Sequence, residues 1–180
     1  MDFTLTYDGD LKANGHIEHK QEIRRIFHKQ LLEYWKHTPF DDLRRPPDTV
    51  TKEVGSFRFF PLVNSGRNEI AELQITMLRP EKGPGYIVGQ GGDLDNRLKT
   101  LFDSLRMPKN IDEIPPNDEP GENEVPFFCL LEDDILITKI SISSDRLVES
   151  CESESYVKLI IYVQIKQTPM IGARMIIRAM

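Results

Sequence analysis

Residues 91–105 have the sequence Gly-Gly-Asp-Leu-Asp-Asn-Arg-Leu-Lys-Thr-Leu-Phe-Asp-Ser-Leu, which combines a regular apolar pattern with a cluster of charged residues. Its large apolar side chains recur at the spacing of one helix face, at Leu94, Leu98, Leu101, Phe102 and Leu105. This spacing predicts an amphipathic helix that begins near Asp93. The two glycines predict a loop before it. The acids that follow suit a helix N-terminus, where free N–H groups and the dipole favour negative charge.

Outside this stretch, the chain predicts a single α+β domain that spans residues 1–180. Apolar and polar residues alternate in Ala71-Glu72-Leu73-Gln74-Ile75, which is typical of a half-buried strand. The elements we expect are a strand at 3–7, a helix at 19–36, paired strands at 55–63 and 69–78, the helix from 93, and strands at 135–143 and 156–166. This order, β-α-β-β-α-β-β, predicts two helices packed on a small mixed sheet.

The composition indicates a cytoplasmic globular protein. The 180 residues are 39% hydrophobic and 29% charged, which suits one domain with its own core. No apolar run approaches the ~20 residues that span a bilayer, and the N-terminus lacks the features of a signal peptide. The two cysteines, Cys129 and Cys151, form neither a disulfide framework nor a zinc-binding pattern, so we expect a cytoplasmic location.

Acidic charge is concentrated in residues 108–126. The segment holds six acidic residues, five prolines and a single basic residue, Lys109. It has no apolar periodicity, so we expect a mobile surface insert. The net charge of −6 argues against a nucleic-acid partner. Because much of that charge lies in one segment, a locally positive face elsewhere stays open.

Acids from two separate segments suggest a metal site. Asp93 and Asp95 stand at the start of the predicted helix, and Asp133 and Asp134 precede a predicted strand. Because like charges repel, acids brought together need a cation, and Mg²⁺ or Mn²⁺ prefers such oxygen ligands. Lys99 lies one turn after Asp95 on the same helix face, where it is placed to stabilise charge on phosphoryl oxygens. Taken singly, each feature is more typical of a helix cap, a surface ion pair or a turn, and only the joint pattern favours a metal site.

The pattern Gly-Asp-Leu-Asp-Asn-x-x-Lys-x-x-x-Asp-x-Leu over residues 92–105 is followed by Asp-Asp before a strand within 131–143. Together these motifs resemble the RusA family of Holliday junction resolvases. The resemblance implies a RusA-like fold and a Mg²⁺-dependent endonuclease that cleaves branched DNA in DNA recombination and repair. It also implies a homodimer, since paired cleavage of a four-way junction needs two active sites related by symmetry.

The resemblance also implies a role for each matching residue. The implied metal ligands and catalytic acids are Asp93, Asp95 and Asp134, with Asp133 as an accessory ligand. Lys99 matches the catalytic lysine of the family, and Asn96 and Asp103 match its supporting positions.

Four basic side chains on the predicted helices are candidate contacts for DNA phosphates, namely Arg24, Arg25, Lys29 and Arg97. A solvated helix face explains them equally well. Two other functions stay open. The same fold could serve as a non-cleaving accessory module that binds nucleic acid, or that docks a basic protein surface through residues 108–126. It could also hydrolyse a small phosphorylated nucleotide.

Overall fold

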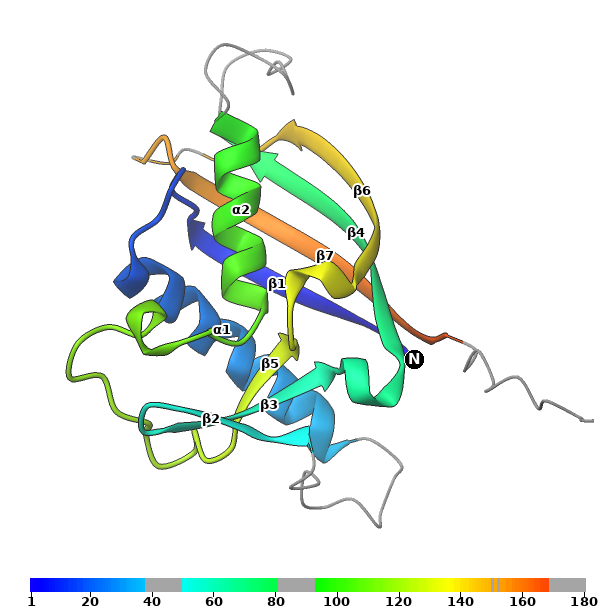
Figure 1. Ribbon diagram of the computed structural model, residues 1–180. Coiled ribbons are helices and arrows are strands. Elements are labelled where there is room, and N and C mark those ends of the chain that lie inside the picture. Colours follow the sequence, from blue (N-terminus) through cyan, green and yellow to red (C-terminus); the bar gives the residue numbers. More distant parts are fainter. Residues whose placement is uncertain (38–49, 81–92, 150, 152, 169–180) are drawn as a thin grey trace, which may run out of the picture.

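The computed structural model describes residues 1–37, 50–80, 93–149, 151 and 153–168, which form an α+β fold (Figure 1). The helices are α1 (Ile17–Lys36) and α2 (Asp93–Leu105). The strands are β1 (Asp2–Asp10), β2 (Lys52–Val54), β3 (Phe57–Val63), β4 (Glu69–Arg79), β5 (Phe127–Leu131), β6 (Ile137–Arg146) and β7 (Tyr156–Gln167). Short 3₁₀ helices join some of them, namely η3 (Ser65–Arg67), η4 (Ile111–Glu113) and η5 (Asp134–Leu136). Within these ranges, no helix has the length and apolar character needed to cross a membrane.

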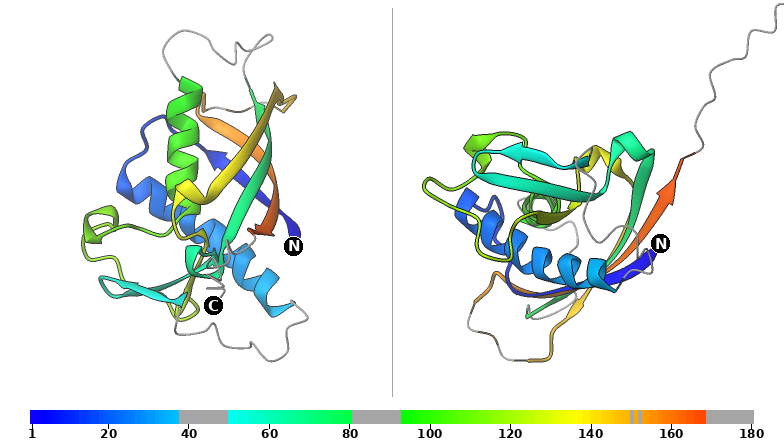
Figure 2. Two further views of the ribbon diagram at one scale, coloured as in Figure 1. Left: turned by 45° about the vertical axis from the view of Figure 1, so that its right-hand side comes forward. Right: turned by 90° about the horizontal axis from the view of Figure 1, so that it is seen from below.

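The larger sheet has the strand order β1-β7-β4-β6 and supports both helices. Strand β7 is antiparallel to β1 and β4, whereas β6 runs parallel to β4. Both helices lie on the same face of this sheet (Figures 1 and 2). Leu73, Ile75 and Met77 of β4 face them and are at most 2% exposed, and they share one core with Phe27 of α1 and Leu101 of α2. The predicted apolar faces of the strand and the helices therefore build the main core.

The smaller sheet, ordered β2-β3-β5, lies between two cores. Side chains alternate across a strand. Phe57 and Phe59 of β3 accordingly join a second core with Phe127, while Phe60 and Phe128 face the main core. Strands β3 and β5 pair in parallel, with Phe59 opposite Phe127 and Phe60 opposite Phe128. Burial on both faces explains why β5 and residues 59–63 of β3 are continuously apolar rather than alternating.

Residues 108–126 are held against α1 and the second core, so the expectation of a mobile insert is not met. Ile114 packs in the second core and is 5% exposed. Asp118 and Glu124 each lie 2.9 Å from the Arg25 guanidinium of α1, and the Asn123 carbonyl bonds to Nε2 of His28 at 3.0 Å. These partners are distant in sequence, so the local composition of the segment did not indicate them.

Both predicted helices are confirmed, but the predicted pairing of residues 55–63 with 69–78 is wrong. Strand β3 occupies the smaller sheet and β4 the larger one. The prediction also missed β2 and β5. Strand β5 sits directly behind a segment with no apolar periodicity, and its partner lies more than sixty residues earlier in the chain, so local alternation did not reveal it. The predicted loop at Gly91 and Gly92 lies outside the described residues.

Candidate metal site beside helix α2

The N-terminal half of α2 presents two exposed charged side chains, Asp95 and Lys99. Neither forms an ion pair or a side-chain hydrogen bond with any residue that the structure describes. Their spacing of four residues places them on the same helix face. Asn96 is half-buried, and its carbonyl accepts a hydrogen bond from the Thr100 hydroxyl at 3.2 Å. The side chain of Asp93 is outside the described part of the chain, so its role as a ligand stays a prediction.

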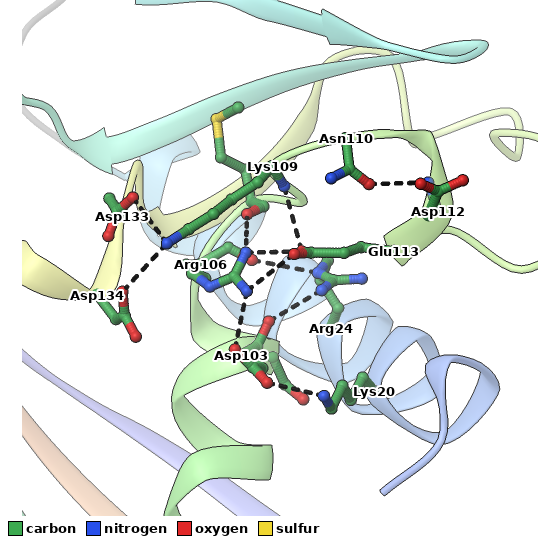
Figure 3. A network of polar contacts seen from close by, with 12 residues as sticks. Lys20, Arg24, Asp103, Arg106, Lys109, Asn110, Asp112, Glu113, Asp133 and Asp134 are labelled. Carbon is green, nitrogen blue, oxygen red and sulfur yellow. Dashed lines mark hydrogen bonds and ion pairs between the residues drawn. The ribbon is translucent and has the colours of Figure 1, made fainter.

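Asp133 and Asp134 form an acid pair at the start of η5, where β5 leads into β6. The Asp133 side chain caps η5, because Oδ1 accepts a hydrogen bond from the Ile135 N–H at 3.1 Å. The Lys109 Nζ lies 3.1 Å from Asp133 Oδ2 and 3.7 Å from Asp134 Oδ1 (Figure 3). Lys109 is therefore the counter-ion of the acid pair.

The pKa values of the two acids of this pair are shifted in opposite directions. Partial burial alone would raise the pKa of Asp133. Hydrogen bonds from the Asp134 carboxyl, the Ile135 N–H and Lys109 outweigh it and lower that pKa to about 2. The hydrogen bond to Asp133 raises the pKa of Asp134, and burial adds to the rise. Asp133 is already committed as a cap, whereas the Asp134 side chain is 42% exposed and freer to accept a new partner.

The C-terminal end of α2 carries a network of ion pairs (Figure 3). Asp103 accepts hydrogen bonds from Lys20 at 2.7 Å and from Arg106 at 2.8 Å, and Arg106 also donates to Glu113 at 2.7 Å. The Arg106 side chain is only 7% exposed. Arg24 donates to the backbone carbonyls of Asp103 and Arg106, which ties α1 to this end of α2. Asp103, predicted as a supporting site residue, is therefore engaged in holding the two helices together.

The Asp133–Asp134 turn lies beside this C-terminal end of α2. The Met107 N–H donates to the Leu131 carbonyl at 2.9 Å, so the chain after α2 runs alongside the end of β5. Asp95 lies eight residues before Asp103, which is about 12 Å along the helix axis.

Within the described residues, no three His, Cys, Asp or Glu side chains form a group that could hold a metal ion. The four predicted ligands thus comprise the close pair Asp133 and Asp134, the separate Asp95, and Asp93, whose side chain is not described. Their chemistry fits a hard cation, since all offer carboxylate oxygens of the kind that Mg²⁺ and Mn²⁺ prefer. Asp133 and Asp134 also lie close enough to interact electrostatically, which a cation would offset.

Three of the four candidate DNA contacts are engaged within the fold. Arg24 is 1% exposed and Arg97 6% exposed. Arg97 donates to the carbonyls of Glu154 and Ser155 at 3.3 and 3.4 Å, and Arg25 is paired with two acids of the 108–126 segment. Of the four, Lys29 alone is exposed. Basic side chains that predicted a phosphate-binding face mostly bind oxygen atoms of the protein itself.

The sequence did not indicate a cavity of about 380 Å³ that opens beside Asp133. Lys52 and Lys109 line it, together with Glu132 and several apolar side chains. Lys52 pairs with Glu132, which also accepts hydrogen bonds from the Ser65 N–H at 2.8 Å and hydroxyl at 2.7 Å. Of the two lysines, Lys109 stood out in the sequence as the single basic residue of the acidic 108–126 segment. Nothing in the sequence distinguished Lys52.

Comparisons with known proteins add no identification. No protein-family model matches the chain, and no curated protein matches it significantly. The function must therefore be inferred from the residues and their arrangement.

Proposed function

We propose that this chain is a RusA-like, Mg²⁺-dependent endonuclease that hydrolyses phosphodiester bonds in branched DNA. One observation carries the proposal. Asp95 and Lys99 are exposed and without a partner among the described residues. The other described charged side chains of α2, Arg97 and Asp103, are engaged in the fold. An acid and a lysine left available one turn apart suit metal-assisted attack on a phosphate.

Each site residue has a distinct task in this proposal. Asp95 and Asp134 would hold the ion, with Asp93 and the accessory Asp133. Mg²⁺ bound there supplies a water of lowered pKa and offsets charge on the phosphate. Lys99 donates a hydrogen bond to a phosphoryl oxygen and stabilises the charge that develops there.

Before the acids can bind the ion, Lys109 must leave them. Its side chain is 48% exposed. Exposed ion pairs contribute at most ~1 kcal/mol, so the displacement costs little. Asp95 and Asp134 must also approach each other, which makes closure between the N-terminal half of α2 and the η5 turn part of the proposal.

The proposed enzyme is a cytoplasmic homodimer. A four-way DNA junction has two strands to cut, and a symmetric pair of subunits supplies one site for each. The negative charge of the chain predicts weak electrostatic attraction to DNA, so the junction must be recognised by its shape and through the bound ion.

Cleavage of a synthetic four-way junction tests the proposal. We expect the purified protein to nick the junction in the presence of Mg²⁺ or Mn²⁺. Asp95→Asn should lower the rate by about 100-fold or more, because a metal ligand contributes several kcal/mol to transition-state stabilisation. Asp112→Asn is the matched control, since Asp112 is also exposed but lies outside the site. It should cleave at the wild-type rate. An intact junction with both ions and the wild-type protein, or full activity of Asp95→Asn, would contradict the proposal.

A second candidate is a non-cleaving module of the same fold, which one observation favours. Lys109 already forms ion pairs with both acids of the pair. A permanent ion pair there would leave a folded binding domain without a catalytic ion. In that case the protein should shift a junction in a gel and never nick it. Docking through the 108–126 segment would involve its exposed acids Asp112, Glu119 and Glu122. Asp118 and Glu124 are paired with Arg25, and Glu113 is paired with Arg106.

A further inference from the structure

The two edge strands of the larger sheet, β1 and β6, differ in the contacts that their outward backbone groups make. At the β1 edge, the Gln30 side chain of α1 accepts a hydrogen bond from the Thr6 N–H at 2.9 Å and donates to the Thr6 carbonyl at 2.7 Å. The helix thus occupies the outward backbone groups of Thr6, near the middle of that strand. At the other edge, no described strand pairs with the outer side of β6. An edge strand with free N–H and C=O groups is a template for pairing with another chain.

The side chains of β6 also suit a partner. Ile140 lies opposite Leu73 of β4, so it faces the core side of the sheet, yet it is 44% exposed. Lys139 and Asp145 lie opposite Glu72 and Leu78, on the other face, and both are exposed. The strand therefore carries an incompletely covered apolar side chain on one face, and two opposite charges six residues apart on the other.

We propose that β6 pairs antiparallel with β6 of a second copy of this chain, across a twofold axis, to join two four-stranded sheets into one. In an isologous interface of this kind the strand must be complementary to itself. Only alternate residues of β6 direct their backbone N–H and C=O groups outward, so each hydrogen-bonded pair joins two odd-numbered or two even-numbered residues. The numbers of any two residues that lie opposite each other therefore add to an even total. This rule leaves registers that differ by steps of two residues.

One of these registers matches the charges. When Ile142 lies opposite Ile142 of the partner subunit, Lys139 lies opposite Asp145 of the partner subunit, and the same ion pair forms twice. The same register places Ser141 opposite Ser143 of the partner subunit, a pair that can hydrogen-bond. The registers two residues to either side place Lys139 opposite a serine or a leucine instead. Opposite charges facing each other across strands stabilise pairing, and like charges destabilise it.

The β1 edge offers no such match. Its sequence, Asp-Phe-Thr-Leu-Thr-Tyr-Asp-Gly-Asp, contains three acids and no basic residue, so self-pairing can oppose acids but never form an ion pair. The β6 interface is inferred from the sheet edge alone. Its success would not establish the proposed nuclease chemistry, and a dimer that forms through another surface would leave the proposed function intact. A wild-type monomer would remove the proposed homodimer as well, whereas junction cleavage tests the chemistry separately.

Sedimentation velocity of charge variants tests the interface. The wild type should be a dimer. Lys139→Asp and Asp145→Lys should each weaken dimerisation by about tenfold or more, because two ion pairs become two repulsions. The double variant Lys139→Asp/Asp145→Lys should recover the wild-type dissociation constant. A mixture of the two single variants should form the heterodimer, which native mass spectrometry distinguishes by mass.

Circular dichroism should show all three variants folded, since both side chains are exposed. Three results would each overturn the interface. They are a wild-type monomer at every concentration, dimerisation that neither single variant changes, and weakened single variants whose double variant stays weak.

Discussion

The two ends of α2 carry the same kinds of charged group in opposite settings. At the N-terminal half, Asp95 and Lys99 are exposed and have no partner among the described residues. At the C-terminal end, Asp103 is paired with both Lys20 and Arg106, and Arg106 is almost fully covered. Residue type alone therefore does not separate a functional acid from a structural one. The partner separates them, because a paired acid stabilises the fold and an unpaired one is available to a ligand.

Arg106→Met should have the largest effect on stability. The substitution removes the shared partner of Asp103 and Glu113 and leaves two partly buried carboxylates with less compensation. Loss of one member of a buried ion pair costs about 3 kcal/mol. Urea unfolding should show this loss. Lys99→Met on the same helix is the matched control, and an exposed substitution of that kind should stay within about 0.5 kcal/mol of the wild type. Equal stability of the two variants would break the distinction between the ends of the helix.

Acid should weaken the C-terminal network next. Burial would raise the pKa of Asp103 and of Glu113, but the bonds from Lys20 and Arg106 to Asp103, and from Arg106 to Glu113, outweigh it and lower both values. A carboxyl whose pKa is lower in the folded protein contributes stability at neutral pH. That contribution is lost as the pH falls through the ordinary values, 3.8 and 4.5, toward the lowered ones. Unfolding midpoints between pH 7 and pH 3 should fall for the wild type. Asp103→Asn should start lower and fall less, whereas a flat wild-type profile would refute the network.

Lys109→Met should have the smallest effect, an increase in the affinity of the Asp133–Asp134 pair for a divalent cation. Without the ammonium, Asp133 and Asp134 lack their counter-ion, so a divalent cation should bind more tightly. An exposed ion pair is worth at most ~1 kcal/mol, which corresponds to about a fivefold gain in affinity. Titration calorimetry with Mn²⁺ measures it without any cleavage assay. Lys52→Met is the control, because Lys52 pairs with Glu132 rather than with the acid pair. An unchanged or weaker affinity of Lys109→Met would exclude competition between Lys109 and the ion.

The sequence revealed the elements whose burial is one-sided. The spacing of Leu94, Leu98 and Leu101 located α2, and the alternation in β4 located that strand, because local periodicity reports which face is buried. It does not report what covers that face. Strands β3 and β5 are buried on both faces and show no alternation. The strand prediction at 55–63 located β3, but β5 and the parallel pairing of the two strands were missed.

The candidate site was predictable to the same extent. The motif located Asp95 and Lys99 on one exposed helix face, as the structure has them. The partners of Asp103, Arg25 and Asp133 come from segments distant in sequence, so the ion pairs depend on the tertiary fold. The acidic segment looked mobile for the same reason, since Arg25, which pairs with Asp118 and Glu124, lies about a hundred residues earlier, in α1.

Anomalous diffraction from crystals grown with Mn²⁺ would show whether the acids of α2 and of the η5 turn bind one ion between them. We expect a single strong peak about 2.1 Å from carboxylate oxygens of both Asp95 and Asp134, with Lys109 displaced from the acid pair. A structure in which Lys109 still pairs with Asp133 and Asp134, and no peak lies within reach of both Asp95 and Asp134, would contradict this expectation.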